Sequence, residues 1–371
     1  MIWEPRTQNL PLTVLMTADA VGGVWSYATR LCRALPRIRF VLATMGPRPL
    51  PAQRDEIARL DNTIIIESSY SLEWMVNCSD DFADSCDRLI KFAECYDVDV
   101  IHVNGYAHAR LGADRPVLVV AHSDVLSWWQ AVHRHSPPPE WGQYRERTTI
   151  GLAAATRIVA PTAAVLRDLE RHYGQLNNAE VISNGIELTT FAPLRNASVV
   201  LAAGRIWDAA KNLAILEAIA PDLAWPVEIA GEVEHPKGGA ARYSNVRLLG
   251  RLSPAEMSRH FGCASIFVAP ARYEPFGLAI LEAAAAGCAL VLGDIPSLRE
   301  NWDRAAVFVD PEDRAALKST INDLIANPRE RSRVAAAVQC RAREFTLRRM
   351  ARAYAALYHE MARTSARLET A

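Results

Sequence analysis

The fold is decided by a stretch that reads Ser265-Ile266-Phe267-Val268, then Glu274-Pro275-Phe276-Gly277-Leu278-Ala279-Ile280-Leu281-Glu282, then Ala289-Leu290-Val291-Leu292. Two short apolar runs rich in β-branched and aromatic residues flank an Ala-rich segment. Proline cannot continue a preceding helix, so we expect the helix to begin at Phe276 or Gly277 and to run to about Ala286. A strand, a helix and a second strand in this order predict a parallel sheet covered by helices.

The same alternation continues along the whole chain. We expect strands at residues 13–17, 40–44, 63–67, 100–103, 117–121, 157–160 and 180–182, and again at 199–203, 227–230, 246–249, 265–268, 289–292 and 306–309. Amphipathic segments that suit helices lie between them. The fold class that this pattern predicts is α/β, with doubly wound, Rossmann-like sheets.

The length of the chain predicts two domains. With 371 residues and no low-complexity stretch, it is too long for one ordinary core. An irregular segment at about 185–197 separates the two strand series, so we place an N-terminal domain at residues 1–190 and a second domain at 191–345. Two such domains face each other across a cleft, and ligands bind outside the carboxyl ends of the strands.

The composition limits the kinds of partner and the cellular compartment that we expect for this protein. The chain has 41 basic and 42 acidic residues, so no global field favours nucleic acid. Its seven cysteines form no C-x-x-C pair, which indicates a reducing, cytoplasmic setting. Met1 to Leu10 lacks the apolar run of a signal peptide. The apolar stretch at 279–292 is interrupted by Glu282 and is too short to span a bilayer.

The two carboxylates around the Pro-Phe-Gly turn suggest a ligand site. The first turn of the predicted helix, Gly277 to Ala279, offers unpaired backbone N–H groups to an anion such as pyrophosphate. Glu274 before the helix and Glu282 within it should stand on the order of 10 Å apart, and both can accept hydrogen bonds from hydroxyl groups. This spacing fits a nucleotide sugar. The alternative is a pair of ordinary helix charges, which are common near helix N-termini.

A pair of cations in the same predicted domain favours the ligand site. Arg205 directly follows the strand at 199–203, and Lys211 lies six residues later, before the next helix. Both can converge on one diphosphate and stabilise the charge of a leaving group. Taken alone, they would be interpreted as surface charges.

The first half of the chain carries two candidate features at strand ends. Gly22 and Gly23 follow the strand at 13–17 and allow the backbone to approach a phosphate or a sugar, although a plain tight turn explains them equally well. His122 directly follows the strand at 117–121, where it would face the cleft. Neither a G-x-x-x-x-G-K-[ST] nor a G-x-G-x-x-G motif is present.

Other polar and aromatic groups are left open or are assigned no role. Trp128, Trp129 and Trp141 either stack on a sugar or pack beneath a Pro-rich loop. Asp97 and Asp99 precede an apolar strand, and we assign no metal site to the chain. The basic residues after the glycine loop face either a membrane, an anionic acceptor or, the favoured interpretation, solvent; they are Arg30, Arg33, Arg37 and Arg39.

Taken together, these motifs resemble the retaining glycosyltransferases of family 4, which have the GT-B fold. The resemblance rests on Gly22-Gly23, His122, Gly204-Arg205 with Lys211-Asn212, and Glu274-Pro275-Phe276-Gly277-Leu278 through Glu282. Their order and their distribution over both halves match the family. The segment from Glu274 to Glu282 is the specific part of the match.

The resemblance implies a transferase that moves a sugar from a nucleotide diphosphate sugar, such as a UDP- or GDP-sugar, to an acceptor hydroxyl. It implies retention of the anomeric configuration and no metal or other cofactor. It implies that the diphosphate is bound by Arg205, Lys211, the Gly22-Gly23 loop and the backbone N–H groups of Gly277 and Leu278. It implies that Glu274 binds the sugar and that Glu282 binds the ribose. It places His122 beside the transferred carbon. Phe276 belongs to the same donor site.

The resemblance also implies that the terminal helix at 346–371 packs back on the first domain. The chain departs from the family pattern in two turns, with Ser183 where proline is usual and Asn212 where glycine is frequent. The acceptor stays open between a small molecule, a glycan and a lipid-linked group with peripheral membrane contact. A sugar-nucleotide epimerase and a non-catalytic nucleotide-sugar-binding subunit are the alternative functions.

Overall fold

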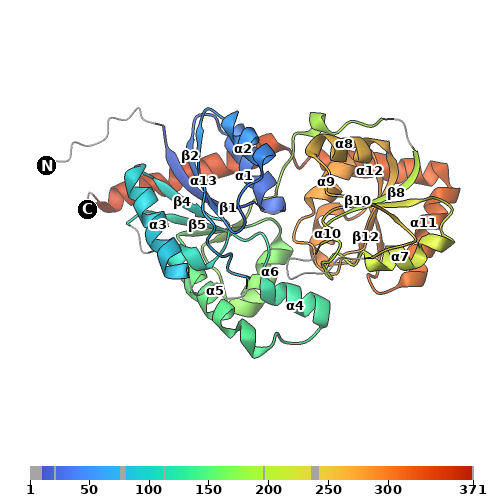
Figure 1. The fold of residues 1–371 in the computed structure, drawn as a ribbon, viewed down its shortest axis with the longest axis horizontal. Coiled ribbons are helices and arrows are strands. Elements are labelled where there is room, and N and C mark those ends of the chain that lie inside the picture. The colour runs from blue at the N-terminus through green and yellow to red at the C-terminus, as the bar shows by residue number, and fades with distance from the viewer. Residues whose placement is uncertain are drawn as a thin grey trace.

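The computed structural model describes residues 11–20, 22–75, 81–111, 114–194, 197–234 and 242–369. The N-terminal segment that bears on the signal-peptide prediction lies outside these residues. The described chain forms two α/β domains side by side, the first coloured blue to green and the second yellow to orange in Figure 1. A long red helix returns from the second domain to the first.

The first domain is built on a seven-stranded parallel sheet in the order β3-β2-β1-β4-β5-β6-β7. Its strands are β1 (Thr13–Asp19), β2 (Arg39–Met45), β3 (Thr63–Ile66), β4 (Val100–Val103), β5 (Val117–Val120), β6 (Arg157–Ala160) and β7 (Ala179–Val181). Its helices are α1 (Gly23–Ala34), α2 (Pro51–Ala58), α3 (Phe82–Cys95), α4 (Val125–His133), α5 (Gly142–Ala154) and α6 (Ala163–Tyr173). Short 3-10 turns are η1 (Ala107–Arg110), η2 (Pro139–Trp141) and η3 (Leu188–Thr190).

The second domain repeats this plan with a six-stranded parallel sheet in the order β10-β9-β8-β11-β12-β13. Its strands are β8 (Ala197–Ala203), β9 (Val227–Ala230), β10 (Arg247–Gly250), β11 (Ala264–Ala269), β12 (Ala289–Gly293) and β13 (Val307–Val309). Its helices are α7 (Ala214–Ile219), η4 (Ala220–Asp222), α8 (Pro254–Cys263), α9 (Leu278–Ala285), α10 (Pro296–Trp302), α11 (Arg314–Ala326) and α12 (Pro328–Ala342).

All thirteen predicted strands are present, each within two residues of its expected ends. They are recognisable in the sequence because helices cover both faces of a parallel sheet, so a central strand is a continuous apolar run. Every residue of β5 and β12 is buried. The predicted helix after the Pro-Phe-Gly turn is confirmed as α9.

The strand order places the candidate residues at the topological switch points. In the first sheet the order reverses between β1 and β4, and in the second between β8 and β11. Crevices at such points hold ligands in doubly wound sheets. Gly22 follows β1, Arg205 follows β8 and Glu274 follows β11.

The chain crosses between the domains twice, and the two crossings are hydrogen-bonded to each other. Ile186 N donates to Phe345 O at 3.1 Å, and Leu347 N donates to Ile186 O at 2.8 Å. A Cβ on Gly185 would lie 2.3 Å from Thr346 O, so only glycine allows this approach. This explains the glycine of the predicted linker.

The last helix, α13 (Leu347–Glu369), packs on the first domain. Its buried side chains Met350, Tyr354, Tyr358 and Met361 join the core formed by α1, β1, β2 and β4. Figure 1 shows it running behind α1 and the first sheet. Within the described part of the chain, no helix combines the length and the apolar character needed to cross a bilayer.

Candidate active site between the two domains

The predicted cations of the second domain each pair with a carboxylate of that domain. Arg205 pairs with Asp208 at 2.8 Å, and Lys211 Nζ donates to Glu274 Oε2 at 2.6 Å. The Lys211 and Glu274 side chains are largely buried, whereas the Arg205 side chain is 43% exposed. The structure therefore brings Arg205, Lys211 and Glu274 to the end of the sheet between β8 and β11.

Asp208 is the carboxylate that pairs with Arg205, and the sequence interpretation missed it. Burial opposes its charged form, but the positive charges of Arg205 and Lys211 outweigh burial and lower its pKa. Its other oxygen accepts a hydrogen bond from Trp128 Nε1 of the first domain at 3.0 Å. The sequence did offer a signal for this pair, because Asp208 lies three residues after Arg205 in the loop that follows β8.

The turn before α9 is held in a conformation that requires its glycine. Gly277 has φ 86°, and a Cβ there would lie 2.6 Å from the Cδ1 of Ile280. Two carbonyl groups just before this glycine are fixed, since Ser297 donates to Glu274 O at 2.6 Å and Asn301 donates to Phe276 O at 3.3 Å. Phe276 itself is buried in the core, so its backbone is the part placed toward a ligand.

The glycine loop of the first domain lies opposite these groups. A Cβ on Gly22 would be 3.9 Å from the Nη1 of Arg205, and a Cβ on Gly23 would be 3.8 Å from the Cδ1 of Leu278. Gly22 has φ 81°, which other residues rarely adopt. The structure thus brings the glycine loop, Arg205 and the start of α9 together from both domains.

Glu282 does not stand free, because Arg30 of α1 forms an ion pair with it. The side chains are 19% and 13% exposed, so the pair is largely buried. Burial raises the pKa of Glu282, and Arg30 opposes that shift. The prediction that Arg30 lies on a solvated helix face is therefore wrong, because α1 packs its side chain toward the second domain; Arg33, one turn on, is 51% exposed and pairs with Glu56.

His122 lies two residues after the end of β5, close to where the sequence predicted it, and its side chain is partly buried. Its Nε2 lies 2.8 Å from Asn104 Oδ1, and its ring contacts Tyr27 edge-on at a centroid distance of 4.5 Å. Burial lowers the pKa of His122 to about 3, so the imidazole is uncharged at neutral pH. Asn104 was not predicted, although a polar residue directly after the apolar strand at 100–103 was a usable signal.

The aromatic residues after His122 do not form one cluster. Trp128 bridges to Asp208, and Trp129 packs on His133 with ring centroids 4.2 Å apart. Trp141 instead contacts Tyr144, with an interplanar angle of 90°. Trp141 therefore packs on α5 of the first domain, and Trp128 links the two domains.

The carboxylate of Asp124, two residues after His122, is buried, caps α4 and is engaged by groups of the first domain. It accepts hydrogen bonds from Ser127 N at 2.7 Å, from Tyr144 at 3.2 Å and from Tyr173 at 2.6 Å. Its role is structural, since four donors of the first domain engage its carboxylate.

Further polar contacts join the domains beside the candidate site. Glu300 of α10 accepts hydrogen bonds from Ala163 N at 2.7 Å and Ala164 N at 2.9 Å, at the start of α6. A carboxylate there also suits the positive end of the helix dipole. Tyr273 lies close by, with its hydroxyl 3.1 Å from Asp124 N.

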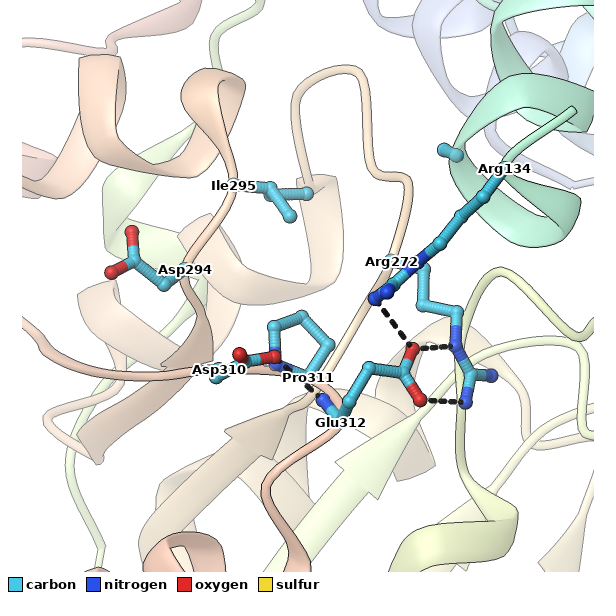
Figure 2. A pocket seen from close by; sticks show the side chains of 8 residues that line it. Arg134, Arg272, Asp294, Ile295, Asp310, Pro311 and Glu312 are labelled. Carbon is cyan, nitrogen blue, oxygen red and sulfur yellow. Dashed lines mark hydrogen bonds and ion pairs between the residues drawn. The ribbon is translucent and has the colours of Figure 1, made fainter.

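Two neighbouring pockets, of about 300 and 220 Å³, lie along this boundary. Figure 2 shows the first, where Arg134 of the first domain and Arg272 of the second both point at Glu312. Arg272 Nε lies 2.5 Å from Glu312, and Arg134 lies 3.7 Å from it. The charges that line this pocket are thus largely matched within the protein. Among the described residues, no group of three or more His, Cys, Asp or Glu is arranged to hold a metal ion.

The protein has two Rossmann-like domains of shared topology. Cations, carboxylates and glycine turns gather where their sheets face each other. This arrangement defines a class of proteins that bind anionic, hydroxyl-bearing ligands between domains. Residues 21–190 match the family model described as Glycosyltransferase Family 4, and residues 197–327 match the model described as Glycosyl transferases group 1. The chain belongs to this family of glycosyltransferases, as the resemblance predicted.

Similar proteins are known from several bacteria. The chain is 28% identical over 217 residues to phosphatidyl-myo-inositol mannosyltransferase of Mycobacterium tuberculosis. The aligned region covers 53% of this chain and 57% of that relative. It is 28% identical over 242 residues to D-inositol 3-phosphate glycosyltransferase of Streptomyces scabiei, covering 55% and 54%. The match thus spans little more than half the length of these curated relatives.

Solved structures share the whole architecture. Sucrose-phosphate synthase from Thermosynechococcus elongatus superposes with a TM-score of 0.78 at 16% identity, over 94% of this chain and 98% of that one. HepE of Anabaena in complex with UDP-glucose superposes with a TM-score of 0.74 at 16% identity, over 94% and 100%. At this identity the likeness shows the fold, and the predicted GT-B architecture is confirmed.

Proposed function

We propose that this protein is a retaining glycosyltransferase that moves a hexose from a nucleotide diphosphate sugar to an acceptor hydroxyl. The observation that carries the proposal is the meeting of Arg205, Lys211 and Glu274 with the Gly22-Gly23 loop. Family membership supports it.

The two cations stabilise the diphosphate as it leaves, which makes the sugar–phosphate bond easier to break. Arg205 and Lys211 hold the diphosphate and stabilise the negative charge that grows on it as the bond breaks, without a metal ion. Backbone N–H groups of Gly277 and Leu278, at the positive end of α9, add to this site. Donor binding then requires Lys211 to exchange Glu274 for phosphate oxygen, which frees the carboxylate to accept hydrogen bonds from sugar hydroxyls.

The nucleoside end of the donor is assigned to Glu282, which accepts hydrogen bonds from the ribose hydroxyls. Because Arg30 occupies this carboxylate, donor binding requires the pair to rearrange. His122 is assigned to the sugar end. With its pKa about 3, it acts there as an uncharged hydrogen-bonding group rather than as an acid.

In this proposal the acceptor binds to the first domain. Two curated relatives are named for phosphatidyl-myo-inositol and for D-inositol 3-phosphate. Phosphorylated polyols, free or lipid-linked with peripheral membrane contact, are therefore the first acceptors to test. The six described cysteines are free, which supports a reducing compartment, and we place the protein in the cytoplasm; cell fractionation checks that placement.

Donor binding is tested by calorimetry with a panel of UDP- and GDP-sugars. We expect one class to bind and Lys211→Ala to weaken it by about 10- to 100-fold, since a charge-assisted hydrogen bond is worth roughly 1.5–3 kcal/mol. Lys318→Ala is the matched control, because Lys318 lies on α11 and pairs with Asp222. Absence of binding across the panel contradicts the proposal.

Turnover is tested by mass spectrometry of donor and acceptor mixtures, with NMR of the product's anomeric configuration. We expect a glycosylated acceptor with the donor's configuration, formed equally well in the presence of a chelator. A changed sugar nucleotide formed from donor alone identifies an epimerase instead. Donor binding without any product identifies a binding subunit.

A further inference from the structure

We propose that Asn104 is the positioning residue of this site, which holds His122 with its proton on Nε2 and its Nδ1 free to accept a hydrogen bond from a ligand. Asn104 directly follows β4, and its side chain lies between two imidazole rings. The inference rests on the proposed function only in assigning that ligand as the donor sugar.

The geometry is a closed set of short hydrogen bonds. Asn104 Oδ1 lies 2.8 Å from the Nε2 of His122 and 3.0 Å from the Nε2 of His102. Asn104 Nδ2 donates to Thr17 O at 2.6 Å, and Asn104 N donates to Thr17 Oγ1 at 3.0 Å. The Nδ2 bond to β1 fixes which end of the amide points at the histidines, and the backbone bond anchors residue 104 itself to β1.

These contacts determine where the protons are. A carbonyl-type oxygen only accepts, so both histidines must donate to Asn104 through Nε2–H. Burial keeps both rings uncharged, lowering the pKa of His102 and of His122 to about 3. An uncharged imidazole carries a single N–H, so the Nδ1 of each ring is an acceptor.

A contact with the terminal helix agrees with this assignment for His102. Its Nδ1 lies 2.6 Å from the hydroxyl of Tyr358 on α13, and a phenol can donate to it. Tyr354, one turn earlier, stacks on the His102 ring at 5.9 Å and holds its plane. A residue more than 250 positions along the chain therefore supports the arrangement beside His122.

His122 differs from His102 in the one respect that matters for a ligand. Among the described residues, nothing donates a hydrogen bond to its Nδ1, and the side chain is only partly buried. An acceptor of known orientation at the end of β5 is suited to a hydroxyl group. Glu274 and His122 would then both select hydroxyl donors, which is the pattern of a sugar.

The experiment compares Asn104→Leu with Asn104→Asp in protein labelled with ¹⁵N-histidine, at pH 8. In the wild type and in Asn104→Asp we expect His122 to show a single tautomer with the proton on Nε2, because an aspartate oxygen still accepts. In Asn104→Leu we expect a mixture. Loss of the amide NH₂ is common to both variants, so a merely structural role would change both spectra alike and overturn the proposal.

His108 is the internal control of each spectrum. Its Nε2 lies 2.9 Å from Ser85 and is outside this network, so its signals should not move. A change at His108 in Asn104→Leu reports general disorder of that variant, and Asn104→Asp then decides: a His122 tautomer other than Nε2–H in that variant overturns the proposal. An unchanged His122 signal in folded Asn104→Leu also contradicts the proposal.

A second measurement tests the link to the ligand. Asn104→Leu should weaken binding of the nucleotide sugar several-fold while leaving binding of the corresponding nucleoside diphosphate unchanged, because the diphosphate site does not include His122. Equal loss for both ligands contradicts the positioning role. A wild type that binds neither ligand refutes the proposed function, whereas the tautomer result stands on its own.

Discussion

At the scale of single residues, unusual backbone conformations account for the two turns that build the donor side of the site. Gly277 and Asn212 both have positive φ, 86° and 55°. Asparagine is one of the few residues that tolerate the left-handed region, which explains why it can stand at 212, where glycine is frequent in the family. The departure noted in the sequence therefore preserves the turn after Lys211.

Asn212 also stabilises the second domain through its side chain. Its amide donates to Pro270 O at 3.0 Å and to Pro311 O at 2.8 Å. We expect Asn212→Gly to lower the free energy of unfolding by about 1–3 kcal/mol through these lost bonds. Asn212→Ala should cost about 1 kcal/mol more, because alanine is strained at φ 55°.

Urea unfolding of both variants measures this difference. Asn322, inside helix α11, is the control position, because there alanine should be better tolerated than glycine. If the alanine variant were more stable than the glycine variant at position 212, as expected at position 322, the backbone conformation of residue 212 would not decide their relative stability.

At the scale of secondary-structure elements, helices α1 and α9 meet across the domain boundary. Gly23 lies near Leu278 at their first turns, and Arg30 pairs with Glu282 further along. Both helix N-termini therefore lie at the boundary, where their dipoles favour an anion. The pair of helices is the frame of the proposed diphosphate site.

The Arg30–Glu282 pair should couple the two helices measurably. A double-mutant cycle with Arg30→Met and Glu282→Gln is expected to give a coupling energy of about 1–3 kcal/mol in unfolding experiments, because both side chains are largely buried. Replacing one partner alone leaves the other buried without its counter-charge.

Arg33→Met with Glu56→Gln is the matched control cycle, since Arg33 lies on α1 like Arg30 and Glu56 lies on α2 of the same domain. Its arginine is more exposed, and we expect no more than about 0.5 kcal/mol. Equal coupling energies in the two cycles would contradict the importance of the interdomain pair.

At the scale of the whole molecule, three uncharged histidines make the first domain sensitive to acid. Burial lowers the pKa of His102 and His122 to about 3 and that of His108 to about 4. In the unfolded chain they titrate near 6.5. Between these values the unfolded state binds more protons, so stability falls as the pH decreases from about 6.5.

We expect the free energy of unfolding to fall less steeply with decreasing pH in His108→Asn than in the wild type. The difference in slope should approach about 1.4 kcal/mol per pH unit below pH 6.5. Urea unfolding at pH 7.5, 6 and 5 measures it, with the exposed His135→Asn as the control. Parallel curves for the wild type and His108→Asn would show that His108 is not buried uncharged.

Much of the architecture could be predicted from local sequence. The central strands are short apolar runs because helices cover them on both faces, and the Pro-Phe-Gly turn marks the start of α9. The candidate residues follow strands, so the rule for parallel sheets placed Arg205, Lys211 and Glu274 at one edge. These features depend on neighbours in sequence or on the order of the strands.

The partners of the site residues could not be predicted in this way. Asp208 joins Trp128, Glu282 joins Arg30 and Asn104 joins His122, in each case through a contact between separate strands, helices or domains. Periodicity specifies which face of an element is apolar, but it does not specify which charge of another element lies opposite. The Glu274–Glu282 segment could thus be recognised in the sequence, whereas only the tertiary structure shows that both carboxylates are already paired, Glu274 with Lys211 of the same domain and Glu282 with Arg30 of the other.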